Sequence, residues 1–266
     1  MIKVAVAGAS GKMGQRIGVL ATEHPDITLS GAFERLGHST IGKDFADVAG
    51  GAKTGVLISN SSEALKGADV AIEFTAAEAT LENLKTYASL KIPAVIGTTG
   101  LSAPQIEELK QFAKTIPIVF APNMSVGVNL LLRVLKDVAS TLGDDYDIEI
   151  VEAHHRLKKD APSGTAIKMA QVIAESLSRD LNEVGVYERK GLIGERSKKE
   201  IGIQTVRAGD IVGEHTVMFG GLGERIEITH KASSRDTFAR GALRAALWIK
   251  NKPAGLYDMQ DVLGLK

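Results

Sequence analysis

The first 120 residues alternate short apolar runs with stretches of helical periodicity, and this alternation constrains the fold more than any other feature of the chain. The apolar runs cover residues 2–7, 27–33, 70–74, 94–96 and 118–120. The helical stretches between them include residues 12–23, 77–89 and 103–114. Strands that are apolar throughout are buried on both faces, as in parallel sheets that crossover helices cover on each side. The pattern therefore predicts an α/β fold with a Rossmann-like, doubly wound parallel sheet.

The second half of the chain has a different rhythm, in which strands outnumber the helices between them. We expect helices over residues 126–142 and 163–178, and strands over residues 146–153, 201–207, 214–219 and 224–231. A further helix is expected over residues 237–250, and periodicity leaves open which of the two predicted sheets it covers. The turn GGLG at residues 220–223 predicts that the last two strands form an antiparallel hairpin. The polar residues 179–199 are expected to form a long surface excursion. This part is therefore predicted to be an α+β domain built on an open mixed sheet.

Residues 146–153 alternate like a strand with one buried face, because successive strand side chains point to opposite sides. We expect Ile148 and Ile150 to face the core, in contrast to Glu149 and Glu152 on the polar side. A sheet covered by helices on one side leaves its other face for pairing with another chain, which favours an oligomer.

Composition excludes several classes of function. The formal net charge is zero, with 32 basic and 32 acidic residues, so nothing favours bulk binding to nucleic acid or an anionic membrane. The chain has no cysteine, which excludes disulfides, thiolate zinc sites and a cysteine nucleophile, and fits a reducing, cytoplasmic location. A strand-like run follows Met1 at once and no long apolar run occurs, so we expect neither a signal peptide nor a transmembrane helix.

A glycine-rich segment lies between the first predicted strand and the first predicted helix. Residues 8–14 read GASGKMG. Glycines at such a turn let backbone N–H groups approach a pyrophosphate at the helix N-terminus. The spacing is a variant of the usual G-x-G-x-x-G pattern, so a glycine-rich turn without a ligand is the alternative interpretation.

An acidic residue and a basic residue end the second predicted strand. Glu34 comes 20 residues after Gly14, where an acid accepts hydrogen bonds from the adenosine ribose. Arg35 follows it and is suited to pair with a 2′-phosphate. A solvated ion pair at a strand end is the alternative. Together the two residues predict that NADH and NADPH are both tolerated.

Two further loops follow predicted strands of the same sheet. They read GTTG at residues 97–100 and APNMS at residues 121–125. The carboxyl ends of strands line the ligand site of a doubly wound sheet, so these small and hydroxylic residues are candidates to bind the nicotinamide end. Two ordinary turns are the alternative.

The segment EAHHRLKKDAPSGT at residues 152–165 combines adjacent histidines, several cations and a helix start. A cluster of cations gains little stability, but a site that holds an anion and moves protons needs such groups. His154 or His155 can donate a proton at neutral pH, and Lys158 or Lys159 can polarise or protonate the substrate. The helix start near Gly164, with the hydroxyls of Ser163 and Thr165, is suited to bind a carboxylate.

Other interpretations of this segment remain open. Histidines are often ordinary polar residues, and neutral imidazoles also bind zinc. Nearby cations disfavour a dication and no cysteine is available, so we expect no metal. A later block with Arg207, Asp210, Glu214 and His215 is expected to form either a charged network that supports the site or ordinary strand and turn charges.

These motifs together resemble the 4-hydroxy-tetrahydrodipicolinate reductase (dihydrodipicolinate reductase) family of the diaminopimelate–lysine pathway. The resemblance covers essentially the whole chain, and the histidine segment is its most specific part. It rests on GASGKMG at 8–14, GTT at 97–99, VGVN at 126–129, EAHHR at 152–156 with Lys158, DAPSGTA at 160–166, RAGDIVGEH at 207–215 and ITHKASSR at 228–235. Leu157 departs from the family, which often has a basic or polar residue there, so the local charge of this segment differs from the family pattern while the reaction implied is the same.

The resemblance implies an NAD(P)H-dependent oxidoreductase that reduces 4-hydroxy-tetrahydrodipicolinate with loss of water. It implies a dinucleotide-binding domain of residues 1–125 and 236–266, and a substrate-binding and oligomerisation domain of residues 126–235 that assembles a homotetramer. It also implies catalytic, proton-donating roles for His154 and Lys158. The substrate would be bound by His155, Ser163, Gly164 and Thr165. The nucleotide, NADH or NADPH, would be bound by Gly8, Ala9, Ser10, Gly11, Lys12, Met13, Glu34, Arg35, Gly97, Thr98, Thr99, Ala121, Pro122, Asn123 and Met124.

Two competing functions are weighed against the reductase. A related two-domain amino-acid dehydrogenase, of the aspartate or homoserine type, fits the glycine loop but not the histidine segment with its Ser-Gly-Thr helix start. A nucleotide sensor or scaffold would keep the glycine loop and would not need the proton-donor cluster. The sequence leaves open the preference between NADH and NADPH, and which of His154 and Lys158 delivers the proton.

Overall fold

The computed structural model describes the backbone of residues 1–266 and the side chains of all of them except residues 61 and 62. The described chain forms two compact units. Unit 1 comprises Met1–Val126 and Arg235–Lys266, and unit 2 comprises Gly127–Ser234. Within the described residues, we find no helix with the length and apolar character needed to cross a bilayer.

Unit 1 is built on a parallel sheet with the strand order β12-β6-β5-β4-β1-β2-β3, in which every neighbouring pair is parallel. Its strands are β1 (Ile2–Ala7), β2 (Ile27–Phe33), β3 (Ile58–Ser59), β4 (Val70–Glu73), β5 (Ala94–Ile96), β6 (Pro117–Phe120) and β12 (Gly255–Tyr257). The order reverses between β1 and β4, which is where sheets of this type bind their ligands. The doubly wound sheet predicted from the apolar runs is confirmed.

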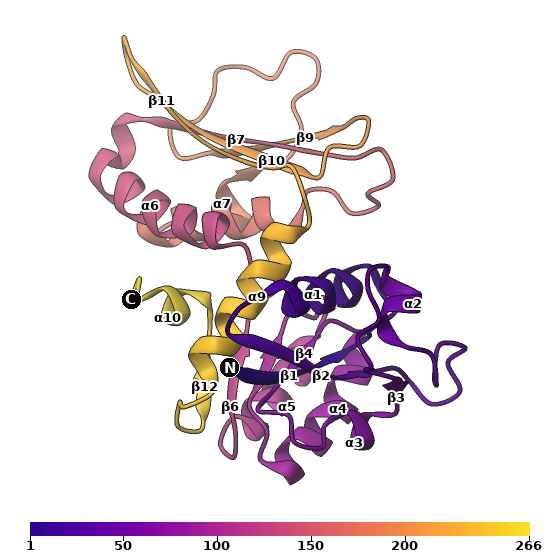
Figure 1. Ribbon diagram of the computed structural model, residues 1–266. Helices are drawn as coiled ribbons and strands as arrows, with labels where there is room; N and C mark the ends of the chain where they lie inside the picture. The colour runs from indigo at the N-terminus through magenta and orange to yellow at the C-terminus, as the bar shows by residue number, and fades with distance from the viewer. The chain divides into compact units, whose positions relative to one another are not determined.

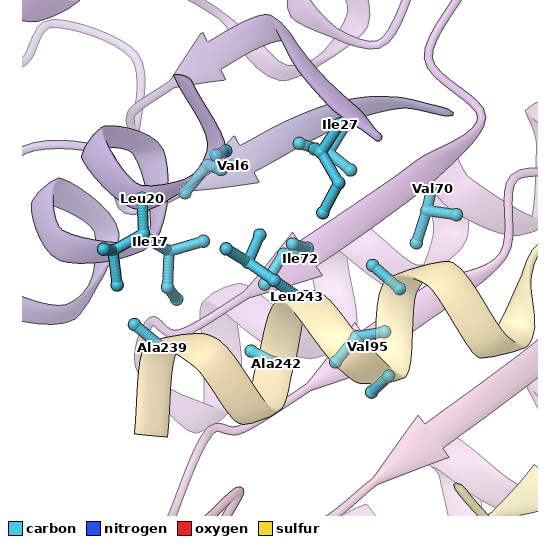
Figure 2. Packing of buried hydrophobic residues seen from close by; sticks show 14 of the residues in the cluster. Val6, Ile17, Leu20, Ile27, Val70, Ile72, Val95, Ala239, Ala242 and Leu243 are labelled. Carbon is cyan, nitrogen blue, oxygen red and sulfur yellow. The ribbon is translucent and has the colours of Figure 1, made fainter. Parts of the chain in front are cut away.

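Helices cover both faces of this sheet, as the apolar strands require. In β1, Val4 and Val6 belong to the core cluster that contains residues of α1 (Lys12–Glu23) and α9 (Asp236–Ile249). Figure 2 shows Ile17, Leu20 and Leu243 meeting strand side chains in this layer. The alternate positions Ala5 and Ala7 pack in a second cluster on the opposite face, with residues of α4 (Ala77–Leu90) and α5 (Ala103–Phe112). The shorter helices of unit 1 are α2 (Phe45–Ala49), α3 (Ser61–Ala64) and α10 (Met259–Leu263).

Periodicity alone left open which of the two sheets α9 covers. Its apolar stripe could have covered either predicted sheet, and it packs in unit 1 beside α1 (Figure 1). The buried stripe consists largely of alanines, among them Ala239, Ala242 and Ala246, whose short side chains allow a close approach to the strands. Trp248 packs edge-on against Tyr257, with 5.1 Å between ring centroids, at the border of this layer.

Unit 2 is built on a mixed sheet with the strand order β11-β10-β7-β9-β8. Its strands are β7 (Asp147–His154), β8 (Gly185–Val186), β9 (Ile201–Arg207), β10 (Gly213–Gly220) and β11 (Arg225–Ala232). The helices α6 (Val126–Leu142) and α7 (Gly164–Ser176) lie along one side of it, and their apolar residues share a core with Ile148 and Ile150 (Figure 1). The predicted hairpin is confirmed, since β10 and β11 pair antiparallel. The predicted α+β domain with an open mixed sheet is therefore confirmed.

One expectation for unit 2 was wrong. Glu152 was expected on the polar side of its strand, but its side chain is fully buried. It shares the parity of Ile148 and Ile150 and so points to the helix-covered face, where neighbouring groups compensate its charge. The excursion at residues 179–199 also contains α8 (Leu181–Val184) and β8, which extends the sheet beside β9.

The turn between β1 and α1 depends on the absence of a side chain at Gly14. A Cβ added there would lie 2.1 Å from the carbonyl oxygen of Gly8. We predict that Gly14→Ala lowers the free energy of unfolding by at least about 1 kcal/mol, because the overlap with a backbone atom outweighs the better helix propensity of alanine. Chemical denaturation measures this.

Gly220→Ala is the matched control for this prediction, since a Cβ there would have its nearest neighbour at 4.0 Å. We expect the control to stay within about 0.5 kcal/mol of the original chain. Equal stability of both variants would contradict the close approach of α1 to the glycine loop.

Candidate active site

The glycine loop follows β1 at the carboxyl edge of the parallel sheet. Gly8 has a φ of +64°, which L-residues rarely adopt, and a Cβ there would lie 2.9 Å from Thr75 Cγ2. The N–H of Gly11 donates to the carbonyl oxygen of Gly8 at 2.9 Å, and the N–H of the buried Ala9 donates to Phe33 at 3.2 Å. The loop is therefore a tight turn held against the ends of β2 and β4.

The N-terminus of α1 is arranged to receive an anion. Gly11 is its N-cap, none of the described side chains caps it, and its first turn contains no acidic residue. Lys12 is exposed at the helix start, whereas Met13 is half-buried against the core. Helix N-terminal N–H groups without a side-chain cap, next to a tight glycine turn, fit a pyrophosphate.

Glu34 lies beside this loop, as predicted, but one of its oxygens is already engaged. Oε1 accepts hydrogen bonds from the Ser10 backbone N–H at 2.9 Å and from the Ser10 hydroxyl at 2.5 Å. This pair ties the end of β2 to the glycine loop and fixes the carboxylate there. Arg35 is exposed next to it.

The loop after β5 packs on the segment that follows β4. A Cβ at Gly97 would lie 2.1 Å from the ring of Phe74, so the loop packs closely on the segment after β4. Thr98 is buried, its hydroxyl lies 2.7 Å from that of Thr80, and its oxygen accepts from the Thr75 N–H at 3.3 Å. Thr99, in contrast, is exposed. Of the two threonines, Thr99 is the one whose side chain faces solvent.

A buried carboxylate that sequence reasoning missed lies under this loop. Glu73, the last residue of β4, is fully buried and accepts hydrogen bonds from the hydroxyl of Thr75, from Tyr87 at 2.5 Å and from Asn83 at 2.9 Å. Burial raises the pKa of Glu73, and these hydrogen bonds oppose that effect. An acidic residue that ends an otherwise apolar strand was the signal for it in the sequence.

The loop after β6 completes the same edge of the sheet. Ala121 is buried and its N–H donates to Ile96 at 3.0 Å, while Pro122 is exposed. Asn123 Oδ1 accepts from the Ser125 N–H at 2.9 Å. Met124 is only 1% exposed and packs in the core, so its side chain is structural and only its backbone is suited to face a ligand.

In unit 2, strand register assembles a second site on the helix-covered face of the sheet. Glu152 pairs with Thr205 on β9 and with His215 on β10, so these side chains form one row across the sheet. His154 pairs with Arg207 in the next row. The row ends at the start of α7, whose N-cap is Ser163.

Glu152 is fully buried and satisfied at both oxygens. Oε2 accepts from His154 Nδ1 at 2.6 Å and from Arg207 Nη1 at 2.8 Å. Oε1 accepts from Arg207 Nη2 at 2.8 Å, from the Ser163 backbone N–H at 2.9 Å and from the Thr205 hydroxyl at 3.2 Å. Burial alone would raise the pKa of Glu152, but the hydrogen bonds from Arg207, His154 and Ser163 lower it to about 2.

Two histidine rings meet in this site. His154 and His215 stand edge to face with 5.2 Å between centroids. Burial lowers the pKa of His154, and the Glu152 carboxylate opposes that shift. Burial and the neighbouring His154 lower the pKa of His215 to about 4, so this ring is neutral at pH 7. His215 Nε2 lies 3.0 Å from the Ser163 hydroxyl, which in turn accepts from the Ala166 N–H at 3.2 Å.

The remaining predicted substrate residues surround this cluster. His155 has a buried Nδ1 with no hydrogen-bond partner among the described residues. Lys158 Nζ pairs with Asp160 at 2.8 Å. Gly164 and Thr165 form the first turn of α7, and a Cβ at Gly164 would meet no atom within 4 Å, so the helix start is open on that side. The structure therefore brings the predicted proton-handling and carboxylate-binding residues to one end of the sheet.

The charged block at residues 207–215 contributes two residues to the site and two to the surface. Arg207 and His215 belong to the site through Glu152 and Ser163. Glu214 points to the other face of β10 and pairs with Lys231 at 3.2 Å, and Asp210 is exposed in a turn. Sequence reasoning missed Glu152 and Thr205, although each shares the parity of buried isoleucines on its own strand, which would have placed it on the core face.

Comparisons with known proteins cover both units. The chain matches two family models, described as Dihydrodipicolinate reductase, N-terminus, over residues 2–124 and Dihydrodipicolinate reductase, C-terminus, over residues 127–263. The 4-hydroxy-tetrahydrodipicolinate reductases of Syntrophus aciditrophicus and Geobacter metallireducens are 58% and 56% identical, with 100% of each chain covered. A solved structure of dipicolinate-bound dihydrodipicolinate reductase from Paenisporosarcina sp. TG-14 has the same fold, with a TM-score of 0.74, 24% identity and 98% of each chain covered.

The parallel sheet with its glycine loop and the histidine–carboxylate cluster define a nucleotide-dependent oxidoreductase. Within that class, the chain belongs to the dihydrodipicolinate reductase family. The family predicted from the sequence is confirmed, and the comparisons do not favour an aspartate- or homoserine-type dehydrogenase. An amine dehydrogenase from Mycobacterium smegmatis shares the fold alone, with a TM-score of 0.60 and 13% identity over 96% of this chain and 94% of its own.

The low pKa of His215 makes stability depend on pH. Its ring stays neutral in the folded chain down to about pH 4, whereas an unfolded histidine is protonated below about pH 6.5. Its stabilising contribution is therefore present above pH 6.5 and is lost as the pH falls toward 4. We predict that the free energy of unfolding falls by about 1.5 kcal/mol less between pH 6.5 and 5 in His215→Gln than in the unmodified chain, as measured by urea unfolding. An unchanged acid dependence in the variant would contradict the neutral, buried ring.

Proposed function

We propose that the chain catalyses the NAD(P)H-dependent reduction of 4-hydroxy-tetrahydrodipicolinate to tetrahydrodipicolinate, with loss of water, in the diaminopimelate–lysine pathway. The observation that carries the proposal is the Glu152–His154 pair beside the N-cap of α7, in a chain that matches the family over both units. The reaction consumes one hydride and one proton and releases water. Unit 1 is proposed to bind the nucleotide, and unit 2 the substrate.

The residues of unit 1 fit a dinucleotide. The tight turn at Gly8 and the uncapped start of α1 suit the pyrophosphate, and Glu34 is held where ribose hydroxyls would reach it. The loops at 97–99 and 121–124 are proposed to bind the nicotinamide end. The nucleotide, when bound, supplies the hydride for the reduction.

The residues of unit 2 fit a small dicarboxylate. Gly164 and Thr165 present the N-terminal turn of α7, which favours an anion, and Lys158 adds a positive charge nearby. Nδ1 of His155, for which the described part of the chain offers no hydrogen-bond partner, supplies a further group for a carboxylate oxygen. Dipicolinate, the dicarboxylate that names the complex of the Paenisporosarcina protein, is therefore a suitable probe of this site.

His154 is proposed to deliver the proton. Its side chain is 11% exposed, and its Nδ1 is held by Glu152. Gly213 packs beside the ring without a side chain, and a Cβ there would crowd Nε2 at 3.0 Å. Nε2 is thus the atom placed to protonate the enamine that hydride addition leaves after water is lost. Lys158, paired with Asp160, is proposed to stabilise the negative charge of the bound dicarboxylate.

The direct test is loss of nicotinamide absorbance with substrate generated from pyruvate and aspartate semialdehyde by the preceding synthase. We expect synthase-dependent oxidation with NADH, NADPH or both. A folded chain that binds the nucleotides and oxidises neither would contradict the proposal. A cytoplasmic location and a homotetramer remain predictions from the family resemblance, and size-exclusion chromatography with light scattering tests the latter.

The role of His154 gives a specific prediction. We expect His154→Gln to lower kcat by about 100-fold or more, because general-acid catalysis contributes about that much, with a smaller change in KM. His24→Gln is the control, since His24 lies in unit 1 at the end of α1. An unchanged kcat in His154→Gln would remove His154 from the catalytic role.

Arg35 gives a prediction for nucleotide choice. Arg35 is exposed beside Glu34 and is suited to pair with a 2′-phosphate, which only NADPH carries. We expect Arg35→Ala to weaken NADPH binding by about 10-fold while NADH binding changes little, as measured by fluorescence titration. Equal effects on the two nucleotides would count against this role.

A further inference from the structure

We infer that Glu152 is a positioning residue that fixes one tautomer of His154 and ties this proton donor to the start of α7. One carboxylate would then set both halves of the substrate site, the atom that transfers the proton and the helix turn that binds a carboxylate. This inference rests on the proposed function of His154.

One oxygen of Glu152 determines which nitrogen of His154 carries the hydrogen. A carboxylate whose pKa lies well below neutral can only accept hydrogen bonds, so the nitrogen that faces it must carry a hydrogen. Nδ1 of His154 lies 2.6 Å from Oε2 of Glu152. The neutral ring is therefore held as the Nδ1–H tautomer, and Nε2 is the nitrogen that gains and loses the proton. This is the arrangement that a proton donor acting through Nε2 needs.

The other oxygen of Glu152 holds the start of α7. Oε1 accepts from the backbone N–H of Ser163, the N-cap of α7, at 2.9 Å. Arg207 donates to both oxygens of Glu152 and also to the carbonyl oxygen of Asp160 at 2.7 Å, in the turn that leads into α7. A displacement of the carboxylate would therefore move His154 and the helix start together. Errors of about 1 Å in such geometry cost catalytic rate.

The charges around His154 set the direction of the pH effect. Glu152 on β7 favours the protonated ring. Lys158, in the loop after β7, and Arg207 on β9 oppose it, and burial opposes it most. Toward β10, the ring faces His215, which is neutral at pH 7. Two further groups stand nearby: Asp160, which pairs with Lys158, and His230 on β11, which lies across the strand pair from His215.

Glu152→Gln removes the carboxylate that is bonded to Nδ1 and favours the protonated ring. We expect the pKa of His154 to fall further, the optimum of kcat to move to lower pH, and kcat at pH 7 to fall by about 100-fold. A glutamine can also present its NH₂ to Nδ1, which would reverse the tautomer. Glu152→Asp keeps an acceptor-only carboxylate, and its kcat is expected to be at least about tenfold higher than that of Glu152→Gln.

The decisive readout is ¹⁵N NMR of the imidazole nitrogens, with the His154 signals assigned by their absence in His154→Gln. In the unmodified protein we expect Nδ1–H and an unprotonated Nε2 at high pH, and this measurement needs no variant that might fold poorly. Glu149→Gln is the control, because Glu149 lies on the same strand but pairs with Arg189 at 2.7 Å on the other face. We expect it to leave the His154 titration unchanged.

Two outcomes would overturn the inference. One is an Nε2–H tautomer of His154 in the unmodified protein. The other is a folded Glu152→Gln variant whose His154 titration and pH profile match those of the control. These results do not depend on which substrate the chain reduces. Inactivity in the synthase-coupled assay would contradict the proposed function. If the Nδ1–H tautomer of His154 is nevertheless observed, the inference that Glu152 positions His154 still stands.

Discussion

The ion pair between the buried Glu152 and the partly exposed Arg207 is the interaction on which the proposed substrate site depends. A charged carboxylate with no exposed surface is tolerated only when a partner and hydrogen bonds compensate its desolvation. Arg207 supplies two of those bonds from the neighbouring strand, and its removal would leave the buried carboxylate without its cation. Because His154 and the Ser163 N–H use the same carboxylate, the stability of this pair and the geometry of the site are linked.

Unit 1 uses a buried carboxylate in a related way but without a cation. Glu73 lies under the loops after β4 and β5 and is satisfied by the hydroxyls of Thr75 and Tyr87 and by the amide of Asn83. In both units, therefore, a carboxylate at the end of a strand organises the loops that are proposed to bind a ligand. The difference lies in the charge: the low pKa of Glu152 reflects its cation, whereas burial raises the pKa of Glu73.

The sequence predicted the parts of the structure that repeat with a regular period. Apolar runs identified the strands of the parallel sheet, and the motifs identified the family. Periodicity alone did not assign a partner to α9, because an apolar stripe shows that a helix is buried but not which sheet it covers; the family resemblance placed residues 236–266 with the parallel sheet. Glu152 was assigned to the wrong face because its charge was given more weight than its parity with Ile150. The Lys158–Asp160 pair joins residues within one irregular loop, where no period applies.

A crystal structure of the chain with dipicolinate bound tests the proposed substrate site most directly. We predict one ligand carboxylate at the N–H groups of Gly164 and Thr165, with His154 Nε2 facing the ring and Nδ1 still bonded to Glu152. A ligand carboxylate bound away from the start of α7, or a His154 ring turned away from Glu152, would contradict this prediction.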